Sequence, residues 1–420
     1  MTPPKNTIAV DVAIVGGGMV GASLALALSQ TLLSVALIEG VDPAASSAQP
    51  SFDDRTTALG NGSRRIFEAL GVWPQMAPDA APIRSIHISD AGRYGFARLV
   101  AAEEGVDAFG YVIVNRVIGR SLWSALGGAT QLHRLMPARA TGLEVSPEAV
   151  QLSIESDDAA LPRSVSARLL VAADGAGSAL RGALGLGAHT EDYGQVALIA
   201  NVSTDRPHDG VAYERFTPTG PLALLPLADG AWGLVWTLEP ARAADVLQFS
   251  DERFLHELQQ CFGWRAGRFT RVGRRASYPL QLNRAEGTVA SRAVLIGNAA
   301  QALHPVAGQG FNLGLRDAAT LAELLADARA ETPGDSFDAG HADMLTAFAA
   351  RRSADRGGVV RFTDGLVKMF GSRMPGVGAA RDLGLLLFDL SPTAKSAMSR
   401  VSWGFAGETP RLARGLALGR

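Results

Sequence analysis

Cysteine is almost absent from this sequence, since Cys261 is the only one among 420 residues. A single thiol excludes internal disulfides and any Cys-x-x-Cys redox pair, which favours a reducing compartment. Basic residues are not in excess either: the formal net charge is -2 and the pI is near 6.4. No Lys/Arg-rich run interleaves with aromatic residues, so nucleic acid is not expected as a partner.

Targeting, membrane and metal motifs are also missing. No N-terminal segment combines a basic region, an apolar stretch and a small-residue cleavage site, and we therefore expect a cytoplasmic protein. The stretch from Ile8 to Leu28 is apolar, but Asp11 and four glycines within it argue against a membrane span. The sequence has no His-Glu-x-x-His segment, no cysteine cluster and no Gly-x-Ser-x-Gly, so neither a metal site nor a hydrolase is expected.

The N-terminal segment has the pattern of a dinucleotide-binding unit. An apolar strand is predicted over residues 8–15, and Gly16, Gly18 and Gly21 follow it at the start of a predicted helix over 22–28. A second predicted strand, residues 34–38, ends in Glu39. The glycines permit the turn, the approach of a pyrophosphate and close helix packing, while the acid accepts hydrogen bonds from a ribose. These parts in this order predict a bound dinucleotide.

A second glycine-rich strand end lies between Arg292 and Asp317. A short strand is predicted over 293–296, followed by a loop and a helix over 312–328. Helix starts collect unpaired N–H groups and the positive end of the helix dipole, which suits a reduced flavin with negative charge on its pyrimidine edge. Taken alone, the same segment also fits a core strand, a tight loop and a core helix.

Four segments together carry a resemblance to a known family. They are the glycine motif at 16–21, the Asp-Asp-Arg at 53–55, the Asp-Gly at 174–175, and HPVAGQGFNLGLRD at 304–317. The chain resembles the FAD-dependent hydroxylases of ubiquinone biosynthesis and is most similar to the 2-polyprenyl-6-methoxyphenol hydroxylases. The segments YERFT at 213–217 and GPLA at 220–223 extend the resemblance over nearly the whole chain.

The resemblance implies that FAD is bound by a defined set of residues. These are Gly16, Gly18, Gly21, Glu39, Arg55, Asn115, Asp174, Asn298, Pro305, Gly308, Gly310, Phe311 and Asn312. Asn298 stands where many flavoproteins have Asp, and its amide oxygen can still accept a hydrogen bond from a ribityl hydroxyl.

Simpler roles compete for several of these residues. Arg55 would lie against the FAD pyrophosphate, but Asp54 and Arg55 could equally form a surface ion pair. Asn115 fits a helix N-cap without any cofactor. Asp174 and Gly175 fit a turn that starts a helix. His304 is interpreted as a structural imidazole rather than a general base.

The expected fold is α/β, with a discontinuous, Rossmann-like FAD-binding domain of the p-hydroxybenzoate-hydroxylase type. That domain is predicted over residues 1–82, 106–185 and 290–335. An antiparallel substrate-binding sheet is predicted over 83–105 and 186–289, and a helical region over 336–420. Within these blocks we predict strands over 143–155, 165–171, 196–202, 211–216, 222–227 and 232–238, and helices over 62–70 and 251–262. The C-terminal helices are predicted over 337–355, 359–370, 377–390 and 394–403.

The family's chemistry is ring hydroxylation. NAD(P)H visits transiently to reduce the flavin, O₂ adds to give a flavin hydroperoxide, and its distal oxygen goes to the aromatic ring of a polyprenylated phenol. No second glycine motif for a resident NAD(P)H is present. No general base stands out, and Tyr193, His208, Tyr213 and Arg215 are candidates to line a substrate pocket or to decorate a solvent face.

The sequence is also compatible with two alternative functions. One is a hydroxylase of the same fold acting on another aromatic substrate, and another is a flavin-holding scaffold subunit of a ubiquinone-biosynthesis complex. The Trp-x-Trp-x-Ile-Pro signature of flavin halogenases is absent. Apolar C-terminal helices with Lys368, Arg373 and Arg381 nearby leave open a peripheral contact with the inner face of the cytoplasmic membrane.

Overall fold

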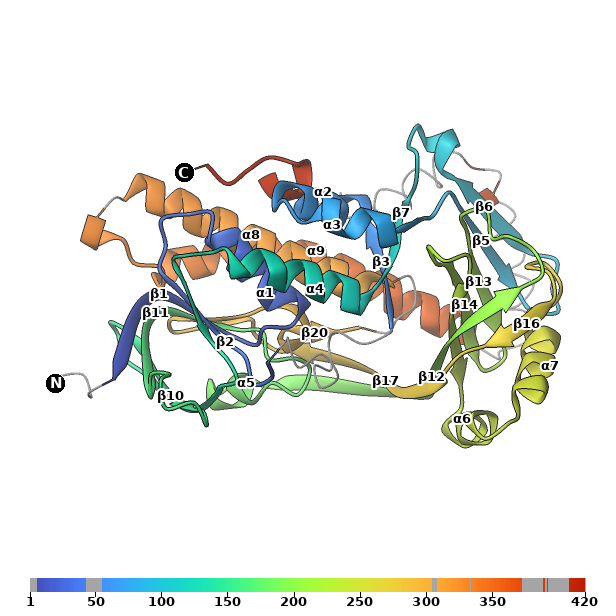
Figure 1. Cartoon of the computed structure of the whole chain (residues 1–420), viewed down its shortest axis with the longest axis horizontal. Coiled ribbons are helices and arrows are strands. Elements are labelled where there is room, and N and C mark those ends of the chain that lie inside the picture. The colour runs from blue at the N-terminus through green and yellow to red at the C-terminus, as the bar shows by residue number, and fades with distance from the viewer. Residues whose placement is uncertain are drawn as a thin grey trace.

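The computed structural model describes residues 6–42, 55–303, 308–332, 334–371, 388–389, 391 and 408–419. Two sheets organise these residues (Figure 1). Helices α1 (Met19–Leu28), α4 (Asn115–Gly127) and α8 (Gln309–Glu331) lie over the first sheet, at the left of the view. The second sheet stands at the right, with α6 (Pro240–Leu247) and α7 (Asp251–Phe262) on its outer side.

The first sheet has a parallel centre in the order β19-β11-β1-β2-β8. Its strands are β1 (Thr7–Val15), β2 (Val35–Ile38), β8 (Leu132–Leu135), β9 (Arg139–Val145), β10 (Val150–Glu155), β11 (Ser164–Ala172), β18 (Val289–Ala290) and β19 (Ala293–Leu295). The apolar runs that predict the central strands become buried on both faces, as parallel sheets require. The strands predicted over 8–15, 34–38, 165–171 and 293–296 are confirmed.

The single strand predicted over 143–155 is wrong. The chain reverses at Ser146–Ala149, and β9 and β10 form an antiparallel hairpin instead. Pro147 lies in that turn, while the Ser146 N–H and hydroxyl both donate to the Ala149 carbonyl oxygen, at 2.9 and 3.0 Å. Proline interrupts a ladder of strand hydrogen bonds, which is the physical reason for the break.

The second sheet has the order β20-β17-β12-β15-β14-β13-β5-β6, with β16 beside β12. Its strands are β5 (Ser85–Asp90), β6 (Phe96–Val100), β12 (Ala188–Thr204), β13 (Val211–Thr217), β14 (Gly220–Pro226), β15 (Trp232–Leu238), β16 (Phe269–Val272), β17 (Ala276–Ala285) and β20 (Gln301–Ala302). The predicted antiparallel strands between 196 and 238 are confirmed. Strands β5 and β6, from the block 83–105, pair as an antiparallel hairpin in this sheet. Only β13 and β5 pair in parallel here.

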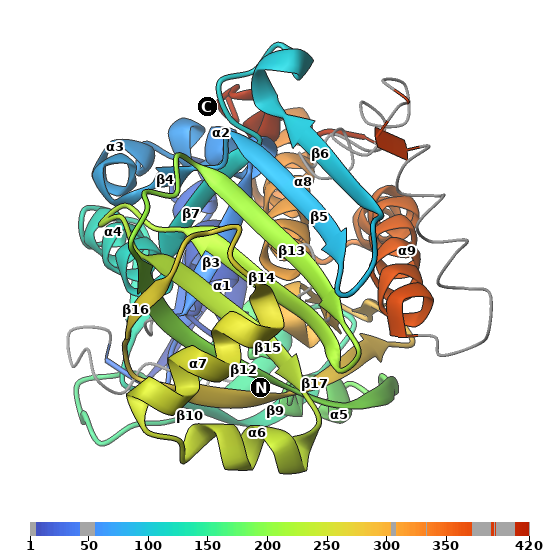
Figure 2. The ribbon, with the colours of Figure 1, turned by 90° about the vertical axis from the view of Figure 1, so that its right-hand side faces the viewer.

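Alternation along the second sheet creates two different faces. Trp232, Leu234 and Trp236 of β15 pack with the core beneath α6 and α7, which cross the outer face in Figure 2. Val235 and Thr237 point to the opposite face.

Helix α7 matches its predicted range. Helix α6 was not predicted, although Glu239 precedes a proline at its first position, a common helix start.

Smaller elements complete the described chain. They are α2 (Asn61–Ala69), as predicted, α3 (Trp73–Met76), α5 (Ala179–Ala183), the one-turn helix η3 (Gly297–Ala299), and a small sheet of β3 (Thr56–Gly60), β4 (Ala81–Pro82) and β7 (Gly110–Val114). Short one-turn helices also occur at Ala77–Asp79, Ala101–Glu104, Gly334–Ser336 and Arg411–Arg414.

The C-terminal helices differ from prediction where the structure describes them. Two helices were predicted over 337–355 and 359–370, but α9 (Ala342–Gly371) is continuous and packs along α8. Gly357 and Gly358 fail to break it because tertiary packing outweighs their low helix propensity. The helix predicted over 394–403 and nearly all of that over 377–390 lie outside the described residues. None of the described helices combines the length and the apolarity needed to cross a membrane.

Candidate flavin and substrate site

The glycine turn after β1 forms a cradle for a phosphate group. Gly16 has a φ of 103°, and a β-carbon on Gly21 would overlap the Gly16 carbonyl oxygen. Gly18 is the N-cap residue of α1 and provides no side-chain cap, so the first N–H groups of the helix remain available to an anion. The Glu39 carboxylate accepts from Gly17 N at 2.6 Å and from Val41 N at 3.0 Å, which holds it beside the turn. The cradle fits the pyrophosphate and ribose of FAD.

Asp174 lies where β11 ends, close to this cradle. One carboxylate oxygen accepts from Leu180 N at 3.3 Å, while Oδ1 is buried without a partner among the described residues. Ser178 caps α5 by accepting from Arg181 N, so Asp174-Gly175 is indeed a turn before a helix. The unpartnered oxygen also fits a ligand hydroxyl, because buried acceptors are normally satisfied.

The start of α8 forms a second, uncapped helix N-terminus. Gly308 precedes it with a φ of 60° and no side-chain cap, and a β-carbon on Gly308 would lie 3.2 Å from the Ala58 β-carbon. Phe311 stacks on Phe67 with ring centroids 6.2 Å apart. His304 and Pro305 lie outside the described residues. The unpaired backbone N–H groups at the start of α8 suit the electron-rich edge of a flavin.

Asn312 makes four hydrogen bonds within the protein. Its oxygen accepts from Gly60 N and Ser63 Oγ at 2.9 and 2.6 Å, and its nitrogen donates to the Ala58 and Gly308 carbonyls, both at 2.8 Å. An amide side chain has no further capacity. The side chain therefore fastens the start of α8 to β3 and α2, and the backbone remains for a ligand.

Asn115 does not cap its helix, so that alternative is wrong. Val114 is the N-cap residue, and the Asn115 oxygen accepts from the Thr57 hydroxyl at 2.6 Å. This bond joins α4 to β3 at the site.

Arg55 extends over the Tyr278 ring, with its guanidinium carbon 4.9 Å from the centroid. Asp54, its alternative ion-pair partner, lies outside the described residues.

A cavity of about 430 Å³ lies between the start of α8 and the inner face of the second sheet. Six predicted cofactor residues line it: Arg55, Asn115, Asn298, Gly308, Gly310 and Phe311. The sheet contributes a largely apolar wall that includes Ala212, Glu214, Pro221, Ala223, Leu225, Val235 and Thr237. A ligand on the flavin side and an apolar ring on the sheet side could therefore meet in one space.

Of the four substrate-pocket candidates, only Tyr213 lines this cavity. Its ring packs on Trp232 and Phe262, with centroids 5.5 and 5.4 Å away on the α7 side. His208 contacts the Leu227 carbonyl oxygen at 2.9 Å, and Arg215 donates to the Cys261 carbonyl at 3.2 Å. Neither they nor Tyr193 belong to the cavity wall.

Glu214 lines the cavity, although no sequence motif predicts a role for it. It is half-buried in the cavity wall, and burial raises the pKa of its carboxyl to about 7. A signal existed: in the strand Val211–Thr217, the alternating residues Ala212, Glu214 and Phe216 share a face, and the other two are buried apolar side chains. A lone acid on such a face indicates a special role.

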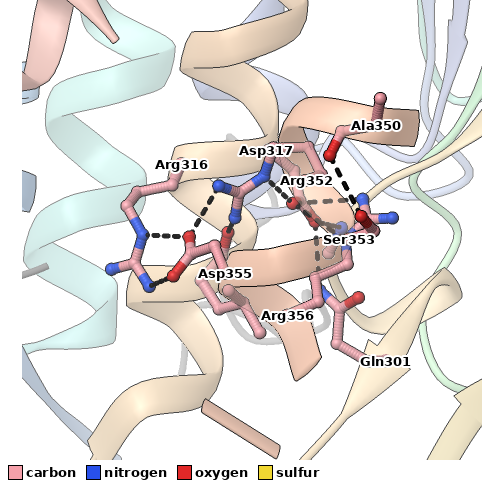
Figure 3. Close-up of polar contacts among 10 residues, drawn as sticks. Gln301, Arg316, Asp317, Ala350, Arg352, Ser353, Asp355 and Arg356 are labelled. Atoms are coloured by element: carbon pink, nitrogen blue, oxygen red, sulfur yellow. Dashed lines mark hydrogen bonds and ion pairs between the residues drawn. The ribbon is translucent and has the colours of Figure 1, made fainter. Parts of the chain in front are cut away.

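A buried ion-pair network lies behind the site (Figure 3). Asp317 of α8 accepts from Arg352 Nε at 2.8 Å and from Arg356 Nε at 3.2 Å. The Asp355 carboxylate accepts two hydrogen bonds from the Arg316 guanidinium, at 2.8 and 3.2 Å, and one from the Arg352 guanidinium, at 2.6 Å. Burial alone would raise the pKa of the Asp317 carboxyl, but Arg356 and Arg352 hold it below its ordinary value.

The same aspartate reaches the flavin-side loop. Its second oxygen accepts from Gly297 N at 3.2 Å and from Gln301 Nε2 at 3.0 Å. Asn298 lies between these two residues and lines the cavity. The network therefore couples the packing of α9 to the position of the loop that presents Asn298.

No group of three or more His, Cys, Asp or Glu side chains suited to a metal ion occurs in the described part of the chain.

Comparison with known proteins agrees with this geometry. Residues 9–350 match the family described as FAD binding domain. The chain is 36% identical over 411 residues to ubiquinone hydroxylase UbiL of Rhodospirillum rubrum, covering 97% of this chain and 93% of that protein. It is 31% identical to 3-demethoxyubiquinol 3-hydroxylase of Escherichia coli, covering 90% and 94%.

A solved structure supports the fold. The chain superposes on p-nitrophenol 4-monooxygenase PnpA of Pseudomonas putida with a TM-score of 0.77 and 18% identity, covering 96% of this chain and 100% of that one. The predicted α/β fold of the p-hydroxybenzoate-hydroxylase type and the predicted FAD cofactor are confirmed. The protein belongs to the FAD-dependent aromatic-ring hydroxylases of ubiquinone biosynthesis.

Proposed function

We propose that this protein hydroxylates the aromatic ring of a polyprenylated methoxyphenol in ubiquinone biosynthesis, using NAD(P)H and O₂. The observation that carries the proposal is the cavity of about 430 Å³, in which predicted flavin contacts face an apolar sheet wall. Curated relatives at 36% and 31% identity bear the names of ubiquinone-pathway hydroxylases, which supports the substrate class.

Bound FAD, reduced by NAD(P)H, would activate O₂ and supply one oxygen atom. The chain's own residues bind, orient and exclude water. Gly16, Gly21 and Glu39 would hold the adenosine and pyrophosphate end, and the start of α8 would hold the ring. Ala223 and Val235 on the sheet offer an apolar surface to the substrate ring and keep water from the reacting atoms.

The proposal is tested with purified, flavin-loaded protein. NAD(P)H oxidation is measured with and without a short-chain prenyl methoxyphenol, and the products are analysed by mass. We expect substrate to stimulate oxidation and to gain one oxygen atom. Bound flavin without stimulation would favour a hydroxylase of another aromatic compound or a flavin-holding scaffold.

Delivery of an apolar substrate is a second part of the proposal. We infer that the C-terminal region contacts the inner face of the membrane or a biosynthetic complex, as the apolar sequence beyond Val359 and the cations Lys368, Arg373 and Arg381 suggest. Flotation with anionic liposomes tests this: the full chain should float, and a variant with these three cations changed to Glu should not.

A further inference from the structure

Glu214 occupies the middle of β13 on the face that forms the cavity wall. On that face its neighbours along the strand are Ala212 and Phe216. Across the sheet it is paired with Ala223 of β14 and Ile88 of β5. All four neighbours are apolar, so a carboxylate at this position lacks the solvation that it would have in water.

The carboxylate also has no structural partner in the part of the chain that the structure describes. Within the described residues it forms no hydrogen bond or ion pair, unlike Asp317 and Asp355 behind the site. Arg55 lines the same cavity, but its guanidinium lies over the Tyr278 ring. A half-buried acid with no such partner in these described segments is a candidate for chemistry in the cavity.

We propose that Glu214 is the catalytic base that takes the proton from the phenolic hydroxyl of the substrate. The inference rests on the proposed function and adds the residue that activates the ring. The phenolic O–H bond breaks, the proton moves to a Glu214 carboxylate oxygen, and the electron pair stays on the phenolate oxygen. That pair is shared with the ortho and para ring carbons, one of which accepts the oxygen atom supplied through bound FAD and O₂.

Proton balance is restored on the same residue. The attacked carbon loses its hydrogen as a proton, which is taken up as the second oxygen atom of O₂ leaves as water, and the ring regains aromaticity. The phenolic oxygen then takes a proton back from Glu214. The carboxylate returns to its starting state, and the step needs no oxidant or base beyond those already named.

Burial makes this acid suited to the task. It raises the pKa of Glu214 to about 7, closer to that of a phenol than an ordinary carboxyl group is. Among the described residues that line the cavity, only Arg55 and Tyr213 carry other titratable groups. Burial raises the pKa of Tyr213 as well, so its hydroxyl stays neutral while Glu214 titrates.

The expected pH dependence follows from the role. A base acts when ionised, so kcat for hydroxylation should rise with pH through about 7 and level off above it. Glu214→Gln keeps the shape and removes the base. We expect its kcat to fall by about 100-fold at pH 7.5 and the rising limb near pH 7 to disappear. Flavin absorbance and substrate KM should stay close to those of the wild type.

Glu144→Gln is the matched control, because Glu144 lies exposed on β9. A second variant, Glu214→Asp, retains a carboxylate and should keep the rising limb at a reduced rate. A ring-fluorinated prenyl methoxyphenol that is already ionised at the assay pH should shrink the Glu214→Gln deficit to less than tenfold. A role in folding alone would show neither the lost limb nor this rescue.

Failure of the inference is distinguishable from failure of the proposed function. Wild-type protein that hydroxylates the substrate, beside a Glu214→Gln variant with unchanged kcat and pH profile, would overturn the base assignment alone. An unchanged deficit with the fluorinated substrate would do the same. Absence of hydroxylated product from the wild type would overturn the proposed function and the inference with it.

Discussion

Gly21 packs against the Gly16 carbonyl oxygen so closely that a β-carbon has no room. The spacing of the glycine motif predicts this contact, because the third glycine lets the helix approach the strand. Local backbone geometry of this kind is encoded in a few neighbouring residues. The structure brings Gly16, Gly21 and Glu39 together at this turn, and their contact with FAD stays a prediction.

Gly21→Ala should disrupt the cradle. The added methyl group must push α1 from β1, and overpacking of this kind costs about 1–3 kcal/mol. We expect FAD affinity to fall at least about tenfold, measured by fluorescence titration of apoprotein. Gly358→Ala is the control: it lies in α9 with open space around it, and its FAD affinity should be unchanged. Equal affinity in the two variants would contradict the placement of the cofactor on this turn.

Other single residues could not be placed from sequence. The motif around Asn312 implied a cofactor contact, but its side chain bonds to Gly60 and Ser63, some 250 positions away along the chain. In the sequence, Glu214 stands out only as part of the segment YERFT, which contributes to the family resemblance. Its neighbours Ala223 and Ile88 come from two other strands, so its isolation is visible only in the folded sheet.

At the scale of elements, α8 and α9 are joined by the buried network of Asp317, Asp355 and their arginines. Hydrophobic spacing predicted α8, but it carried no information about which charges meet across 35 or more positions. The same limit explains the missed hairpin of β9 and β10, where the turn at Pro147 outweighed a continuous pattern of strand residues.

Asp317→Asn should destabilise the protein by about 3 kcal/mol, because it leaves Arg352 and Arg356 buried beside a neutral amide. The folded-state pKa of Asp317 is below its ordinary value, so its stabilisation is complete above about pH 4 and is lost as pH falls further. The difference in Tm between wild type and variant should therefore be constant near neutral pH and shrink in acid.

Asp157→Asn is the control for thermal unfolding, since Asp157 lies exposed in the loop between β10 and β11. Its Tm should follow that of the wild type at every pH. A Tm difference for Asp317→Asn that grows in acid would contradict the sign of the assigned pKa shift. Because Asp317 also holds Gly297 and Gln301, weaker FAD binding should accompany the loss of stability.

At the scale of the whole molecule, the cavity exists only where the second sheet meets the start of α8 (Figure 2 views this sheet from its outer side). The sequence predicted the second sheet and helix α8, and the resemblance predicted the cofactor. Neither predicted which residues of the sheet line the cavity. Of four substrate-pocket candidates from the inserted sheet, three fall outside it, because strand alternation was not resolved into an inner and an outer face.

Ala223→Phe should fill the sheet side of the cavity and leave the flavin side intact. We expect FAD to bind normally, KM for the phenol to rise about tenfold or more, and NAD(P)H oxidation to yield hydrogen peroxide in place of product. Ala244→Phe, at an exposed position of α6, is the control and should behave as the wild type. Unchanged KM in Ala223→Phe would show that the ring binds elsewhere.

The most direct test of ring hydroxylation in this cavity is isotopic. Flavin-loaded protein is supplied with NADPH, a short-chain prenyl methoxyphenol and ¹⁸O₂, and the product is analysed by mass spectrometry. The account predicts one ¹⁸O atom on a ring carbon, formed in proportion to the NADPH oxidised. Oxygen from water in the product, or NADPH oxidation with unmodified phenol recovered, would contradict it.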